Sequence, residues 1–76
     1  MRELLTGIAK RLVDNPDQVS VTEVDGATTK ILELSVMKQD LGKIIGKRGR
    51  TIAAIRTIMM AASAKTNKRI VIEVAE

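Results

Sequence analysis

The apolar residues of this chain change from a helical spacing to an alternating one and back, and the order of these changes limits the fold more than any other feature. Over residues 4–13 they recur three and four positions apart, which predicts an amphipathic helix that ends before Pro16. Residues 19–24 and 29–36 are rich in β-branched and alternating apolar residues, and Asp25-Gly26 between them is typical of a turn. The first half of the chain is therefore predicted to be a helix followed by a β-hairpin.

The second half of the chain returns to the helical spacing twice before it ends in a strand. Residues 39–45 fit a short helix that Gly46 stops, and a longer helix is predicted after Gly49, up to about Lys65. Residues 70–74 alternate again and predict a last strand. The order α-β-β-α-α-β predicts an α+β fold, in which a three-stranded sheet carries the helices packed on one face.

The short polar gaps between these elements contain no linker, repeat or low-complexity stretch. Residues 1–76 are therefore expected to form one domain. A chain of this length buries only about 60% of the surface that its unfolded form exposes, so its core must be modest. A second chain that covered further apolar surface would help it to stay folded.

The residue types that are missing exclude several classes of function. The chain contains no Cys and no His, which removes disulfides, thiolate zinc sites, thiol nucleophiles and imidazole acid–base chemistry. We therefore expect a protein that is not an enzyme and that holds no metal and no cofactor. The lack of Cys also favours a cytoplasmic location, and no apolar run approaches the roughly 18 residues of a membrane span.

Positive charge is concentrated in one part of the chain. Residues 38–56 carry six Lys or Arg side chains against Asp40 alone, a balance of +5 that leaves −1 for the rest of a chain whose net charge is +4. A basic segment on a nearly neutral protein is typical of proteins that bind polyanions, and a merely solvated basic face is the alternative. Asp40 is expected to be a residue of the helix start without a chemical role.

The tetrapeptide Gly46-Lys47-Arg48-Gly49 joins the two predicted helices of the second half. Its glycines permit a tight turn and allow a sugar–phosphate backbone to approach the main chain closely. The next helix starts directly after Gly49, so its unpaired N–H groups and positive dipole end favour an anion. Lys47, Arg48 and the following Arg50 add donors for phosphate oxygens. The alternative is an ordinary turn between helices with solvated charges.

The position of this tetrapeptide between two helices of an α-β-β-α-α-β chain resembles a KH domain of type II topology. Over residues 44–58 and in its size, the sequence is similar to the KhpA family of small bacterial single-KH RNA-binding proteins, and the resemblance covers essentially the whole chain. It implies that the tetrapeptide clamps the backbone of single-stranded RNA over about four nucleotides, as an RNA chaperone or post-transcriptional regulator. The RNA-binding residues that we expect are Lys43, Ile45, Gly46, Lys47, Arg48, Gly49 and Arg50.

The resemblance also implies an apolar groove beside the tetrapeptide on which the bases lie. Its expected residues are Leu34, Val36, Ile44, Ile45 and Ile52, for which the alternative is an ordinary place in the core. The chain has no Phe, Tyr or Trp, so the bases cannot stack on aromatic rings. Binding is therefore expected to depend on phosphate contacts, to weaken with salt and to discriminate little between sequences.

A second apolar stripe runs along the longest predicted helix, roughly 100° around from its core-facing residues. The stripe consists of Ala54, Ile58, Ala61 and Lys65 with Thr57 and Met60 at its borders, and we expect it to form a dimer interface. The resemblance implies a homodimer, a larger KH-containing partner of the KhpB or Jag type, or both. The alternatives are that Ile58 is buried by the chain's own elements or is simply exposed.

Two other functions remain open from the sequence. The first is an adaptor that presents the Ile58 stripe to a partner protein, with RNA binding incidental. The second is single-stranded DNA binding, because phosphate contacts alone do not read the 2′-hydroxyl.

Overall fold

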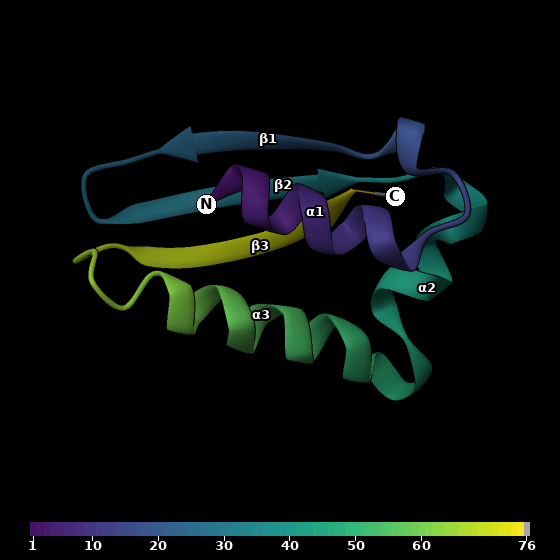
Figure 1. Cartoon of the computed structure of the whole chain (residues 1–76). Coiled ribbons are helices and arrows are strands. Elements are labelled where there is room, and N and C mark those ends of the chain that lie inside the picture. The colour runs from purple at the N-terminus through teal and green to yellow at the C-terminus, as the bar shows by residue number, and fades with distance from the viewer. Residues whose placement is uncertain (76) are drawn as a thin grey trace.

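The elements follow one another along the chain in the predicted order (Figure 1). The structure is a computed structural model and describes residues 1–75. The α-helices are α1 (Arg2–Leu12), α2 (Leu41–Ile45) and α3 (Arg50–Ala62), and the strands are β1 (Ser20–Asp25), β2 (Thr29–Ser35) and β3 (Arg69–Ala75). Short 3-10 turns lie at Pro16–Gln18, Lys38–Asp40 and Lys47–Gly49.

The three strands form one mixed sheet in the order β1-β2-β3. β1 runs antiparallel to β2, with Val21 opposite Leu34, and β3 runs parallel to β2, with Ile72 opposite Leu32. Parallel neighbours need a long crossover, and here α2 and α3 provide it. Because β3 pairs with β2 only, its other side is a free sheet edge.

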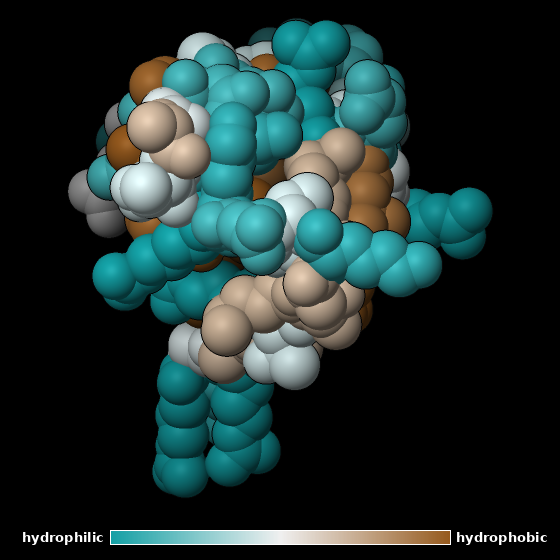
Figure 2. Space-filling view, turned by 90° about the vertical axis from the view of Figure 1, so that its left-hand side faces the viewer, coloured by the Kyte–Doolittle hydropathy of each residue, from teal (hydrophilic) through white to brown (hydrophobic). Residues whose placement is uncertain are grey.

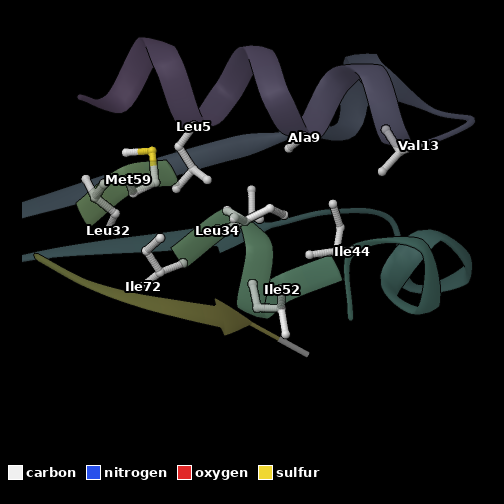
Figure 3. Packing of buried hydrophobic residues seen from close by; sticks show 10 residues of the cluster. Leu5, Ala9, Val13, Leu32, Leu34, Ile44, Ile52, Met59 and Ile72 are labelled. Carbon is white, nitrogen blue, oxygen red and sulfur yellow. The ribbon is translucent and has the colours of Figure 1, made fainter. Parts of the chain in front are cut away.

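The helices share one core with a single face of the sheet. In Figure 3, Leu5 and Ala9 of α1 point towards Leu32 and Leu34 of β2, and Met59 of α3 lies beside them. Burying these apolar side chains is the main force that holds the helices on the sheet. The predicted α+β fold with helices on one face is therefore confirmed. The buried apolar residues are Leu5, Ala9, Val13, Leu32, Leu34, Ile44, Ile52, Ile55, Met59 and Ile72.

Two helix boundaries differ from their predicted positions. α3 ends at Ala62 and not near Lys65, because the hydroxyl of Ser63 donates to the Met60 carbonyl over 3.0 Å and that of Thr66 donates to the Ser63 carbonyl over 2.8 Å. Such local bonds compete with a continuing helix. The predicted helix over residues 39–45 begins instead with a 3-10 turn, and α2 proper starts at Leu41.

Within residues 1–75, every helix is too short or too polar to cross a bilayer.

Candidate nucleic-acid interface

The loop between α2 and α3, residues 46–49, has an unusual backbone and is called the glycine loop below. Gly46, Arg48 and Gly49 all have positive φ, at 77°, 58° and 73°. The Gly46 N–H donates to the Gly42 carbonyl over 2.8 Å, and the Gly49 N–H donates to the Gly46 carbonyl over 3.1 Å. These bonds close two successive tight turns, so the chain reverses between the helices within four residues.

Gly46 is required for two reasons, and Gly49 for one. A Cβ at Gly46 would lie 2.1 Å from Oγ1 and 2.6 Å from Cβ of Thr51, in addition to the strain of its positive φ. A Cβ at Gly49 would meet open space, so only its φ favours glycine there. The loop is thus packed tightly against the first turn of α3 on the Gly46 side and is open on the Gly49 side.

Three basic residues in the glycine loop or directly after it are free to contact a ligand. Lys47, Arg48 and Arg50 are exposed, and none of the ion pairs among residues 1–75 involves them. α3 begins at Arg50 and is 13 residues long, so its unpaired first N–H groups and its positive dipole end lie next to these three side chains. The arrangement suits a polyanion with regularly spaced phosphates.

The two other predicted RNA-binding residues lie on α2. Lys43 is about half exposed, and its Nζ lies 3.1 Å from Oδ2 of Asp14, in the connection after α1. Ile45 is half-buried and packs against the core next to Gly46. Lys43 is therefore engaged by a carboxylate, whereas Ile45 lines the start of the loop.

The predicted groove residues lie mostly in the core. Leu34 and Ile44 are fully buried and Ile52 is nearly so, which confirms the core interpretation for these three. Val36 and Ile45 are half-buried at the edge of that core.

A cavity of about 580 Å³ lies instead between α3 and β3. Arg56 and Met60 line it from α3, so Met60 lies in this cavity and not at the border of the Ile58 stripe. The other walls come from the segment between α3 and β3, including Lys68, and from β3. The full lining is Arg56, Met60, Ser63, Ala64, Thr66, Lys68, Arg69, Ile70, Val71 and Ile72. The spacing of residues does not predict this groove, because the groove depends on β3 being an edge strand. The basic pair Lys68-Arg69 at the start of the last strand was the available signal.

The far end of this groove is tied to the β-hairpin. Lys68 donates a hydrogen bond to Asp25, and this bond lowers the pKa of the Asp25 carboxyl below its ordinary value. The backbone N–H of Arg69 donates to the Thr28 carbonyl over 2.9 Å. The turn after α3 is thus held in place by the hairpin, with basic side chains at both ends of the groove.

Asp40 is the residue that precedes α2, as predicted for a helix-start residue, and its side chain is buried there. Burial alone raises its pKa, but the side-chain and backbone N–H groups of Asn15, together with the backbone of Asp14, donate to it and bring the pKa below its ordinary value. The carboxylate therefore stays charged at the start of α2, where it accepts hydrogen bonds from Asn15 instead of capping the helix with its side chain.

The Ile58 stripe lies on the solvent side of α3. Ile58 is 48% exposed, and Ala54, Thr57 and Ala61 are exposed beside it, so burial within the chain is excluded for Ile58. The Thr57 hydroxyl donates to the Ala53 carbonyl over 3.1 Å, which satisfies it within the helix. Figure 2 shows pale and tan side chains over the lower part of the molecule, where α3 lies in Figure 1.

The chain is similar to a family of KH domains and to proteins of several bacteria. The family model described as "KhpA/KhpB, KH domain" matches residues 2–74. A protein of Clostridium acetobutylicum named RNA-binding protein KhpA is 55% identical over 74 residues, which cover 97% of this chain and 99% of the relative. The protein of the same name from Chlamydia pneumoniae is 51% identical over 76 residues, covering 100% of this chain and 97% of the relative. The one from Aquifex aeolicus is 46% identical, covering 100% and 96%.

No solved structure matches the chain significantly. The relatives are named as RNA-binding proteins, which confirms the expectation of a protein without catalytic activity. The mixed three-stranded sheet, the three helices on one face and the match over residues 2–74 lead to one conclusion: the chain belongs to the KhpA/KhpB family of KH domains.

Proposed function

We propose that this protein binds single-stranded RNA by holding its phosphates at the glycine loop and laying its bases along the groove between α3 and β3. The observation that carries the proposal is the cluster of Lys47, Arg48 and Arg50, exposed and without ion pairs in the described residues, at the N-terminus of α3. The relatives named RNA-binding protein KhpA support the choice of ligand.

The dimensions of the site support a short segment of RNA. α3 has 13 residues and is therefore about 20 Å long. The glycine loop lies at one end of this length and Lys68 and Arg69 at the other, with Arg56 on the groove wall between them. A surface of this length suits the roughly four nucleotides that a KH loop and groove hold.

The composition of the groove supports broad recognition. Its walls contain aliphatic and basic side chains, and the chain has no aromatic residue on which a base stacks. Phosphate contacts position RNA but do not read its sequence. We therefore propose a cytoplasmic RNA chaperone or post-transcriptional regulator with low sequence specificity.

Charge reversal in the glycine loop tests the proposal. Lys47→Asp together with Arg48→Asp places carboxylates where phosphates would lie, so binding of a fluorescent single-stranded RNA at moderate salt should be lost in anisotropy titrations. Both residues are exposed, so the circular dichroism spectrum should not change. Matched RNA and DNA strands of one sequence, titrated in parallel, distinguish the two nucleic acids.

The control is Lys10→Asp with Arg11→Asp on α1, which contributes no residue to the glycine loop or the groove. Both double variants reduce the net charge from +4 to 0. The control should keep most of the affinity. Equal binding by wild type and the folded loop variant would refute the proposed site.

We also propose that the Ile58 stripe is an interface, for a second copy or for a larger KH-containing protein of the KhpB or Jag type. The exposed Ile58 among small alanines supports it, since such a surface lets another helix approach closely. Arg56 and Met60 each lie two positions from Ile58, about 160° around the helix, so RNA in the groove and a partner on the stripe do not compete. An adaptor that acts through this stripe alone is the second candidate function.

A further inference from the structure

Asp40 is the one charged side chain that is buried among residues 1–75, with 1% of its surface exposed. Its Oδ2 accepts two hydrogen bonds from Asn15, one from the backbone N–H over 3.0 Å and one from Nδ2 over 3.1 Å. Asn15 lies 25 residues earlier, in the connection between α1 and β1. The pair therefore fastens the N-terminal part of the fold to the start of α2.

Burial of a charge is unfavourable unless hydrogen bonds compensate for it, and here Asn15 provides them. An apolar residue at position 40 would avoid the burial of a charge but would leave the backbone N–H of Asn15 without its acceptor. Buried polar pairs of this kind are in several proteins a means of fixing one geometry at the expense of stability. The contact therefore fixes the position of the start of α2 relative to Asn15, in addition to satisfying the groups involved.

α2 needs external anchors to hold its orientation. It has five residues and no side-chain cap at either end, and a helix this short is not stable alone. The fully buried Ile44 anchors it near its C-terminal end, and Asp40 anchors its N-terminal end. The exposed ion pair between Lys43 and Asp14 adds little, because water and salt screen it. Without the Asp40 contact, α2 is held mainly by Ile44 and Ile45, which both lie at its C-terminal end.

The orientation of α2 determines where the glycine loop begins. Gly46 follows the last residue of α2, and its N–H is bonded to Gly42 within that helix. On its other side Gly46 lies so close to Thr51 that there is no room for a Cβ between them, so a rotation of α2 would move the loop relative to the first turn of α3. A change at Asn15 or Asp40 is therefore transmitted to the loop through α2.

We propose that the pair Asn15–Asp40 is a positioning device that holds α2, and with it the glycine loop, in the geometry that binds RNA. Neither residue touches RNA in this scheme. The inference rests on the proposed RNA-binding function, since it names the residues that keep that site in shape.

A side-chain exchange tests the device. Asn15→Asp places two carboxylates face to face and should weaken RNA binding by about tenfold, the scale expected when a site loses its supporting contacts. The double variant Asn15→Asp with Asp40→Asn restores one amide opposite one carboxylate and should recover affinity to within about twofold. Gln18→Glu adds the same charge at an exposed position of the same connection and should change little.

Three readouts separate positioning from loss of fold and from loss of phosphate contacts. Urea unfolding curves first establish that each variant is fully folded under the conditions of the binding experiment. The salt dependence of binding should stay that of wild type, because the loop cations are intact. The amide NMR signals of Gly46 and Gly49 should move in Asn15→Asp and return in the exchanged double variant. If Asn15→Asp does not fold, Asn15→Ala, which removes only the side-chain donor, takes its place.

Unchanged affinity and unmoved glycine signals in the folded single variant would overturn the positioning role. So would a double variant that binds as weakly as the single one. A different result would show that the proposed function itself is wrong. In that case wild type and the Lys47→Asp, Arg48→Asp variant bind RNA equally well, or neither of them binds RNA. The glycine signals test the positioning even in that case.

Discussion

Gly46 and Gly49 have similar φ values but different surroundings. A Cβ added at Gly46 would lie too close to Thr51 for any side chain to fit, whereas a Cβ added at Gly49 would meet open space. Between them Arg48 adopts φ 58° without being glycine, which costs roughly 1–2 kcal/mol. Backbone strain of this size persists where the surrounding structure enforces it, and it is common at ligand-binding sites.

Alanine at the two glycine positions should therefore have unequal effects. Gly49→Ala should lower the free energy of unfolding by about 1 kcal/mol, because only its φ is unfavourable. Gly46→Ala should cost about 3 kcal/mol or more, because the new Cβ also displaces Thr51 and the first turn of α3. Urea unfolding followed by circular dichroism measures both values. Similar costs at the two positions would mean that Thr51 moves aside easily.

α3 uses three of its sides for three different purposes. Ile52, Ile55 and Met59 face the core, Arg56 and Met60 line the groove, and the Ile58 stripe faces solvent. A helix packed on the edge of a small sheet has enough free surface for this division. Association and RNA binding should therefore respond to different substitutions on the same helix.

Ile58→Asp tests the stripe without disturbing the fold. Because Ile58 is half exposed, the change should alter the free energy of unfolding by less than about 0.5 kcal/mol. In analytical ultracentrifugation the variant should be monomeric at concentrations where wild type associates, and it should still bind RNA. The comparison variant Ile55→Asp, three residues earlier and 2% exposed, should unfold.

Identical sedimentation of wild type and Ile58→Asp would remove the interface proposal. If instead the monomeric variant keeps its RNA affinity but does not replace the wild-type protein in cells, the adaptor function is the more important one.

Across the whole chain, charge is distributed unevenly between the surfaces. The glycine loop and the groove carry exposed basic residues, while the uncovered face of the sheet brings Glu33 and Glu73 side by side on β2 and β3. This separation disfavours binding of a polyanion to the open sheet face and favours the α3 side. RNA should therefore approach from one direction.

The salt dependence of binding reports how many cations meet phosphates. A plot of log affinity against log salt should have a slope of about −2 if the three loop cations each contact one phosphate of a single strand. Lys47→Gln should make the slope shallower by about 0.7. Lys10→Gln on α1 should leave it unchanged. A slope near zero for wild type would contradict binding through phosphates.

Local patterns of residues were sufficient for much of this fold. The spacing of apolar residues predicted each helix and strand in order, because periods of 3.6 and 2 follow directly from backbone geometry. Gly46 and Gly49 marked the loop, because glycine favours positive φ whatever surrounds it. The end of α3 was misjudged, since hydroxyl groups of Ser63 and Thr66 bond back to the chain and stop the helix early.

Other features depend on contacts between distant parts of the chain. The spacing of apolar residues does not show which distant residues contact each other. The groove exists because β3 pairs in parallel with β2 and leaves an open edge beside α3, whereas Leu34, Ile44 and Ile52 fill the core. Asp40 is buried because Asn15, 25 residues away, satisfies its carboxylate. The residues of this protein thus specify the elements and the loop through local geometry, while tertiary packing alone decides which surfaces face a ligand and which groups are buried together.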